Sequence, residues 1–124
     1  MTVIREAEAP RFEVPGVRFA GLAAPSRGSA DVCTWRITVE PRFVSDQPHA
    51  LDRDEIFMVT GGALRVTEDG ELLGPGDAAV VPAGKPIFVT NPGDEPAHAY
   101  VAIAAGFTAI MADGASLGTP PWAC

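Results

Sequence analysis

Two stretches decide the fold of this chain: H-A-L-D-R-D-E-I-F-M-V-T-G-G, residues 49–62, and G-P-G-D-A-A-V-V-P-A-G-K-P-I-F-V-T-N, residues 74–91. Each contains a short run of β-branched and aromatic residues, which favours a β-strand. Glycine and proline flank both runs, and these residues favour turns. We therefore expect the segment from His49 to Asn91 to form strands joined by tight turns, at Gly61-Gly62 and between Gly76 and Gly84.

The spacing of residues in these stretches resembles the two signature motifs of the cupin superfamily of small β-barrels. Six residues separate Glu55 from Gly62, as in the first motif, and His49 stands at that motif's first histidine. The offsets of the second motif are matched by Gly76, Pro82, Gly84 and Asn91. The resemblance covers roughly residues 39–105. It implies an all-β fold, a cupin double-stranded β-helix or jelly-roll barrel of the small conserved-barrel type, with few or no helices.

Three motif positions carry other residues. Leu51 replaces the second histidine of the first motif, Ile87 replaces the histidine of the second motif, and Phe43 replaces the first motif's leading glycine. The resemblance implies a metal site of three imidazoles and one carboxylate, of which only His49 and Glu55 remain. Because catalytic zinc sites normally use three protein ligands, we favour a cavity without a metal cofactor, made apolar by the leucine and the isoleucine.

A divalent transition metal is the alternative, held by His49, Glu55 and His98. In the segment from Ala97 to Ala105, one alternate set of residues is wholly apolar, and this set is the better inward face. That assignment turns His98 and Tyr100 outward, whereas a register slip of one residue would reverse it. The exposed mouth of the barrel is the expected place for Asp52 and Asp54.

Composition narrows the classes of function. The 124 residues suit one domain, and 13 glycines with 12 prolines suit many turns. A net charge of −7 argues against nucleic acid, which calls for a basic patch. No apolar run approaches the roughly 20 residues of a membrane span, and the acidic N-terminus does not resemble a signal peptide. We therefore expect a cytoplasmic protein, in which Cys33 and Cys124 are free thiols. The composition, rich in alanine, glycine, proline and valine, suits a bacterial source.

We expect a single cupin domain, residues 1–124, with an N-terminal arm at 1–10, a core barrel at about 32–105 and a C-terminal tail at 111–124. Alternation along V-C-T-W-R-I-T-V, residues 32–39, directs Cys33, Trp35, Ile37 and Val39 to the core. Further strands are predicted at 11–14, 17–22, 55–60, 78–81 (short and buried), 86–90 and 97–105, with a hairpin joining 63–66 to 71–73.

Both faces of the strand at 55–60 are apolar. A strand exposed to solvent on one side would not show this pattern. Ile56 and Met58 therefore either pack under another layer of the chain or lie at a subunit interface. Small cupins commonly dimerise through sheet faces, so the resemblance favours the interface and a homodimer. Trp122, in the tail, either caps the barrel mouth or docks on a neighbouring subunit.

The sequence predicts a site for a small organic molecule, with His49 and Glu55 as its catalytic residues. The predicted ligand pocket consists of Trp35, Leu51, Phe57, Ile87, Val89 and Asn91. An inward Glu55 in an apolar pocket has its pKa raised by desolvation, and a nearby His49 lowers that pKa again. Such a pair can act as general acid and base. It can equally form one internal hydrogen bond and be merely structural.

Our interpretation is a metabolic or biosynthetic accessory enzyme that acts on an organic metabolite by metal-independent acid–base chemistry, such as isomerisation, dehydration or cyclisation. A non-catalytic ligand-binding or sensing barrel is the first alternative. A metal-dependent oxygenase with a reduced ligand set is the second. The fold itself does not choose among them, because this barrel architecture hosts many chemistries.

Overall fold

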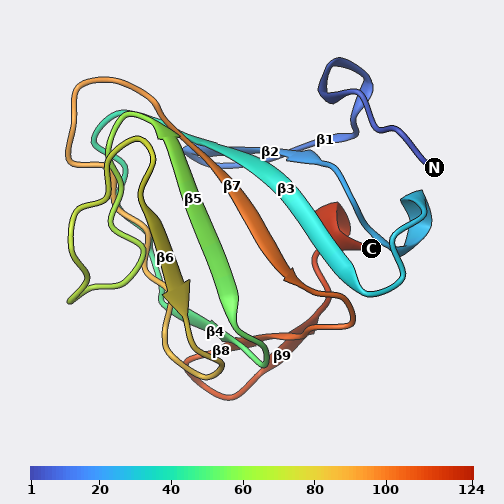
Figure 1. Ribbon diagram of the computed structural model, residues 1–124. Helices are drawn as coiled ribbons and strands as arrows, with labels where there is room; N and C mark the ends of the chain where they lie inside the picture. Colours follow the sequence, from blue (N-terminus) through green and yellow to red (C-terminus); the bar gives the residue numbers. More distant parts are fainter.

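The computed structural model describes all 124 residues, and nearly all of its regular structure is β-strand (Figure 1). In chain order, the elements are η1 (Glu6–Glu8), β1 (Arg11–Val14), β2 (Val17–Gly21), η2 (Pro25–Arg27), β3 (Val32–Val39), β4 (His49–Leu51), β5 (Glu55–Gly61), β6 (Ala78–Val81), β7 (Ala97–Ala104), β8 (Ala109–Met111), β9 (Ser116–Gly118) and η3 (Pro121–Ala123). The η elements are single 3-10 turns, and no helix is long and apolar enough to cross a membrane.

Two antiparallel sheets build the barrel. The larger sheet has the strand order β1-β2-β3-β7-β5-β6, and the smaller one has the order β4-β8-β9. In Figure 1 the smaller sheet lies at the lower end of the long strands β5 and β7. The all-β barrel predicted from the sequence is confirmed.

Alternation of residues explains which side of the large sheet is the core. Along β3, Cys33, Trp35, Ile37 and Val39 are all buried, whereas the residues between them are half-buried. Along β7, the four residues Ala97, Ala99, Val101 and Ile103 are equally buried and lie opposite the buried residues of β3. Both predicted inward faces are therefore confirmed, including the register of β7 that turns His98 and Tyr100 outward.

Gly62 shows why a motif glycine ends β5. Its φ of +68° lies in the left-handed region, where side chains are strained. A Cβ atom there would stand 2.7 Å from the carbonyl oxygen of Pro96 and 2.8 Å from the Cα of Ala97. Only glycine lets the start of β7 pass this closely to the end of β5.

Four details differ from the sequence predictions. The strand β6 exists, but it is not buried: it is the sheet edge, and Val80 is 63% exposed. Residues 86–90 form no continuous strand, because they pair only through single bridges at Ile87 and Thr90. The hairpin after β5 is likewise reduced to one bridge, between Leu64 and Leu73. The small sheet was not predicted, neither β4 nor β8, nor β9 in the tail that was expected to be coil, since β8 pairs with β4 nearly 60 residues away in the chain.

The sheets of the barrel include strands from both ends of the chain, outside the expected core of 32–105. Strands β1 and β2 extend the large sheet, and β8 and β9 build the small one with β4. The tail is held to β3 by the Cys33 thiol, which lies 3.3 Å from the carbonyl oxygen of Ala123. Both Cys33 and Cys124 are free thiols.

The outer side of β5, β6 and β7 carries four exposed hydrophobic residues, which we call the outer apolar patch. They are Ile56, Met58, Val80 and Tyr100, exposed by 37%, 38%, 63% and 36%. The register places Ile56 opposite Val80, and Met58 opposite Tyr100. Ile56 and Met58 therefore do not pack under another layer of this chain, which was the first of the two predicted alternatives.

Candidate active site

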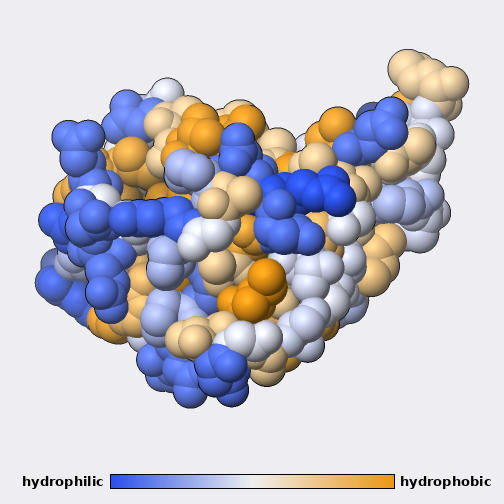
Figure 2. All heavy atoms as spheres, turned by 90° about the horizontal axis from the view of Figure 1, so that it is seen from below, coloured by the Kyte–Doolittle hydropathy of each residue, from blue (hydrophilic) through white to orange (hydrophobic).

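A cavity of about 450 Å³ is lined by residues of both sheets and of the C-terminal tail. Of its 24 lining residues, 17 are hydrophobic. In the view from below, an orange hydrophobic area lies near the middle of the surface, with blue hydrophilic atoms above it, below it and on the left (Figure 2). The volume lies within the range of metabolite-binding pockets, roughly 300 to 1,000 Å³.

Glu55 is the buried acid of this cavity. It is the first residue of β5, paired with Val81 of β6 and Ile103 of β7, and it shares the inward face with Phe57 and Val59. Its side chain is only 5% exposed, lines the cavity and has no hydrogen-bond partner in the protein. Burial raises the pKa of Glu55 to about 8, because the apolar surroundings disfavour the carboxylate. At neutral pH the group is therefore mostly a protonated acid.

His49 is the second titratable residue of the cavity. It begins β4, opposite Met111 of β8, and its backbone exchanges two hydrogen bonds with Ile87. The imidazole also has no hydrogen-bond partner, and burial lowers its pKa, which favours the neutral ring. No hydrogen bond joins His49 to Glu55, and burial alone accounts for the raised pKa of the carboxyl. The expected lowering of that pKa by His49 is absent.

The residues at the other two motif positions do not fit a metal ion. Leu51 and Ile87 are 5% and 2% exposed and line the same cavity as His49 and Glu55. Hydrocarbon side chains offer no lone pair, and no three His, Cys, Asp or Glu residues in the structure are grouped as metal ligands would be. The cavity thus offers a metal two protein ligands, one fewer than catalytic zinc sites normally use.

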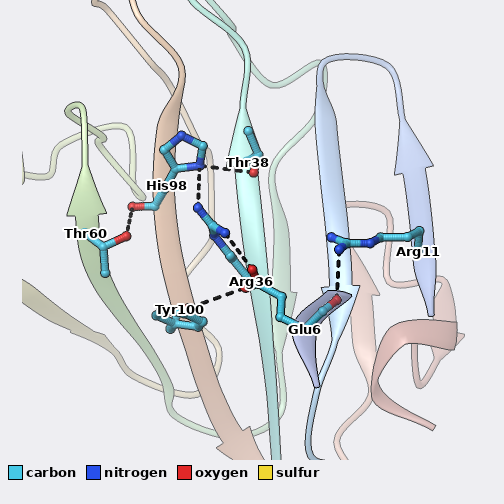
Figure 3. A network of polar contacts seen from close by, with 7 residues as sticks. All are labelled: Glu6, Arg11, Arg36, Thr38, Thr60, His98 and Tyr100. Carbon is cyan, nitrogen blue, oxygen red and sulfur yellow. Dashed lines mark hydrogen bonds and ion pairs between the residues drawn. The ribbon is translucent and has the colours of Figure 1, made fainter. Parts of the chain in front are cut away.

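His98, the candidate third ligand, lies on the opposite side of the sheet. Its Nδ1 is 3.2 Å from Nη2 of Arg36 and 3.2 Å from the hydroxyl of Thr38 (Figure 3). A guanidinium can only donate, so Nδ1 accepts, and the proton of the neutral ring lies on Nε2. The predicted outward direction of His98 is thus confirmed, and its use as a metal ligand in the cavity is ruled out by position.

Five of the six predicted pocket residues line the cavity: Trp35, Leu51, Phe57, Ile87 and Val89. Asn91 does not, and its placement in the pocket was wrong. Its amide nitrogen lies within 3.2 Å of three carbonyl oxygens, those of Val39, Glu40 and Glu95. The motif asparagine therefore links the end of β3 to the turn before β7 by hydrogen bonds.

Asp52 and Asp54 are exposed, and each accepts a hydrogen bond from the backbone of a neighbouring loop. Asp52 accepts a hydrogen bond from the backbone N–H of Thr108, at 2.7 Å, and Asp54 accepts one from that of Ala83, at 2.9 Å. Neither lines the cavity.

Part of the cavity wall was not predicted from the sequence. The tail contributes Leu117 to Trp122, and Phe19, Phe43 and Phe107 complete the wall. The ring of Trp122 stacks on Phe19, with centroids 3.8 Å apart and planes at 10°. Trp122 therefore lies against its own barrel, which is the first of its two predicted placements. The P-P-W sequence indicated a docked coil, but nothing local identified Phe19 as the surface beneath it.

The arrangement of the cavity combines a neutral acid with a neutral base. At neutral pH, protonated Glu55 can donate a proton, and neutral His49 can accept one. The two hydroxyl groups on the wall are already hydrogen-bonded: the Ser45 hydroxyl donates to the carbonyl oxygen of Val89, and the Thr119 hydroxyl donates to that of Phe107. Proton transfer to and from a bound molecule is thus the chemistry open to these side chains.

A family model described as a cupin domain matches residues 35–103, more than half of the chain. No curated protein shows significant sequence similarity to this chain. Among solved structures, the chain is similar to the polyketide cyclase RemF from Streptomyces resistomycificus, with a TM-score of 0.73 and 18% identity, covering 84% of this chain and 79% of that one.

Two further structures share the fold. A sugar phosphate isomerase of the cupin superfamily from Silicibacter pomeroyi has a TM-score of 0.68 and 22% identity, covering 95% of this chain and 93% of that one. KdgF from Halomonas sp. has a TM-score of 0.68 and 20% identity, covering 84% and 93%. The family model spans most of the chain from β3 to β7, including the motif residues Glu55, Gly62, Gly76 and Gly84. The chain therefore belongs to the cupin superfamily.

Proposed function

We propose that this protein is an enzyme that binds a small organic metabolite in the barrel and transforms it by metal-independent acid–base chemistry. The observation that carries the proposal is Glu55, a buried carboxyl without a protein partner. Buried polar groups in proteins are nearly always hydrogen-bonded. An unpartnered acid that faces a cavity has its hydrogen-bonding capacity free for a group of a bound ligand.

In the proposed mechanism, Glu55 is the acid and His49 the base. The carboxyl proton of Glu55 passes to a carbonyl oxygen of the ligand, while His49 takes a proton from the neighbouring carbon. An enol results, with Glu55 as carboxylate and His49 as imidazolium. Return of the protons at different atoms gives isomerisation; loss of a β-hydroxyl as water gives dehydration; attack of the enol carbon on a second carbonyl gives cyclisation. A protonated carboxyl in an apolar site is a known way to stabilise charge on such an oxygen.

Two named relatives in fold are consistent with this class of chemistry. RemF is described as a polyketide cyclase, and the Silicibacter pomeroyi protein as a sugar phosphate isomerase. Both names denote reactions in which carbon–carbon or carbon–oxygen bonds are rearranged without net oxidation. At this level of identity they support the reaction class only.

The test is proton exchange in D₂O. Neutral ketones are incubated with the protein, and loss of the NMR signal of protons next to the carbonyl is followed. We expect wild-type protein to accelerate the exchange, and Glu55→Gln and His49→Ala each to reduce it by roughly a hundredfold or more. His98→Ala, on the outer face, is the matched control and should retain full activity.

Retention of exchange in both cavity variants, with folding intact, would contradict the acid–base proposal. Binding without exchange would favour the sensing barrel instead. Elemental analysis of protein purified without chelator tests the oxygenase alternative: near-stoichiometric iron, manganese, nickel, copper or zinc would contradict a metal-independent mechanism.

We also propose that two copies associate through the outer apolar patch. Ile56, Met58, Val80 and Tyr100 are exposed together on one face of β5, β6 and β7, whereas exposed apolar residues are usually scattered. Light scattering should show a dimer for wild-type protein and a monomer for Met58→Glu, because a buried carboxylate without a partner is costly. A monomeric wild-type protein would refute this part of the proposal.

A further inference from the structure

We infer that the ligand of this cavity is an uncharged, flat aromatic molecule bearing a carbonyl group, and that phosphorylated, carboxylated and sugar-like metabolites are excluded. This inference deepens the proposed function, because it concerns the same cavity and assigns its substrate class. Three features of the cavity support it: its charges, its aromatic wall and its small number of free polar groups.

No cationic side chain lines the cavity. The chain has nine lysine and arginine residues, and none of them is among the 24 residues of the wall. Three arginines, Arg11, Arg18 and Arg36, lie instead around a second hollow on the outer face of the large sheet. A phosphate or carboxylate in the cavity would lose its hydration without gaining an opposite charge, which is strongly unfavourable.

Aromatic rings are concentrated in the wall. Six of the nine aromatic residues line the cavity: Phe19, Trp35, Phe43, Phe57, Phe107 and Trp122. Three of them form a continuous surface, since the ring centroids of Trp35 lie 5.9 Å from Phe107 and 6.5 Å from Trp122. The planes of these two rings are inclined to that of Trp35 by 27° and 64°. Such a wall favours a ligand with planar rings, which can pack on it face-on or edge-on.

The wall offers very few free polar groups. Ser45 and Thr119 use their hydroxyls on backbone carbonyls, as described above. Glu55 and His49 are the ionisable side chains free to bond a ligand, and the indole N–H of Trp122 is a further donor without a partner. A sugar would bury several hydroxyls without partners, and each unpaired hydroxyl would weaken its binding. A carbonyl oxygen that accepts the proton of Glu55 matches what the wall provides.

A cationic ligand is the strongest competing occupant, because aromatic faces attract cations and Glu55 could ionise beside one. Against it stands the burial of Glu55, a single carboxyl with no second acidic residue on the wall. One carboxylate repays the desolvation of a buried cation only with excellent geometry and further hydrogen bonds. An amine is therefore included in the test as a separate probe.

The test compares three probes of nearly equal shape at neutral pH: 2-acetonaphthone, a neutral ketone; 2-naphthoate, an anion; and 2-naphthylmethylamine, a cation. Binding to the full-length protein is measured by calorimetry and by quenching of tryptophan fluorescence, with glucose 6-phosphate as a further competitor. We expect the ketone to bind, and to bind at least roughly tenfold more tightly than each charged probe. Trp122→Leu should weaken ketone binding by roughly tenfold, because it removes one ring of the wall.

Several results would overturn the inference: no saturable binding of the ketone, equal or tighter binding of the naphthoate or the amine, or preferential binding of glucose 6-phosphate. The proposed function is scored separately by deuterium exchange into the acetyl group of the same ketone. Glu55→Gln keeps a hydrogen-bond donor, so it should still bind the ketone but lose the exchange. Binding without exchange in wild-type protein would contradict the mechanism and leave the ligand class standing. Exchange of sugar phosphates but not of the ketone would contradict the ligand class and leave the mechanism standing.

Discussion

The two faces of the large sheet treat their polar residues in opposite ways. On the outer face, Glu6 receives hydrogen bonds from Arg36 at 2.9 Å and from the hydroxyl of Tyr100 at 3.4 Å, and Arg36 also reaches His98 (Figure 3). On the cavity side, Glu55 of β5 and His49 of β4, in the small sheet, have no side-chain partner at all. Each side thus presents a glutamate and a histidine, but only the outer pair, Glu6 and His98, belongs to a network.

The difference indicates which pair is available for chemistry. A partnered polar group has its hydrogen-bonding capacity used by the fold, whereas an unpartnered buried one carries a cost that a ligand can relieve. The outer pair can be explained entirely as structure, because it anchors the 3-10 turn η1 to β3 and β7. The inner pair has no structural explanation of that kind.

The largest expected effect is on the pH dependence of stability, through Glu55. The folded pKa of about 8 exceeds the ordinary value of 4.5, so the folded state keeps a proton that the unfolded chain releases between these values. Stability is therefore expected to fall as pH rises through this window, by up to about 5 kcal/mol. Glu55→Gln should abolish this contribution and stabilise the protein at alkaline pH.

The measurement is urea unfolding at about pH 5.5 and about pH 8.5, an interval that covers most of the expected loss of stability. Glu71→Gln, on an exposed loop, is the matched control and should keep the wild-type pH dependence. An unchanged slope in Glu55→Gln would show that Glu55 is not the group responsible, and would remove the contrast between the two faces.

The next effect tests a buried polar residue that does have partners. Asn91 is 1% exposed, as buried as Glu55, but its amide is bonded to backbone carbonyls. Asn91→Ala should destabilise the protein by about 2 to 3 kcal/mol, because buried carbonyl groups lose their donor. Chemical unfolding measures the loss. Ketone binding should survive under folding conditions, and its selective loss would mean that Asn91 contributes to the cavity after all.

A smaller effect separates the two histidines. Burial lowers the pKa of His98, and the charges of Arg36 and Arg18 lower it further, while Glu6 raises it. Arg36→Gln should therefore raise the pKa of His98, and Glu6→Gln should lower it. Burial alone lowers the pKa of His49, which should change in neither variant.

NMR titration of the two imidazoles follows both residues in one spectrum. The His49 signal serves as the internal control. A pKa of His49 that shifts with Arg36→Gln would mean that the inner and outer faces are electrostatically coupled, and the comparison drawn above would fail.

The smallest expected effect is that of Tyr100→Phe. The hydroxyl of Tyr100 lies at the edge of the outer network, exposed to water and 3.4 Å from Glu6. Exposed pairs of this kind contribute little, so the loss of stability should be at most about 0.5 kcal/mol. Unfolding measurements at high and low salt check it. A loss above about 1 kcal/mol would show that the outer network acts as a tightly coupled unit.

Much of the fold and part of the site could be predicted from local patterns. Alternation along β3 and β7 gave the buried faces correctly, including the outward direction of His98. Spacing identified Glu55 and His49, because both stand at motif positions and alternate with apolar residues. Asn91 was misplaced for the same reason: its motif position was known, but its hydrogen-bond partners on β3 lie more than 50 residues away in the chain.

The β-barrel, the inward faces of β3 and β7, and the hydrocarbon residues at two of the usual ligand positions could be read from the sequence. Alternation and turn chemistry are local properties, so they can be read without knowing what packs where. The missing partner of Glu55, the closure of the wall by Trp122 and the absence of cationic side chains from the cavity could be seen only in the folded chain. These features depend on how the barrel closes, since a cavity exists only where segments distant in sequence leave a space between them.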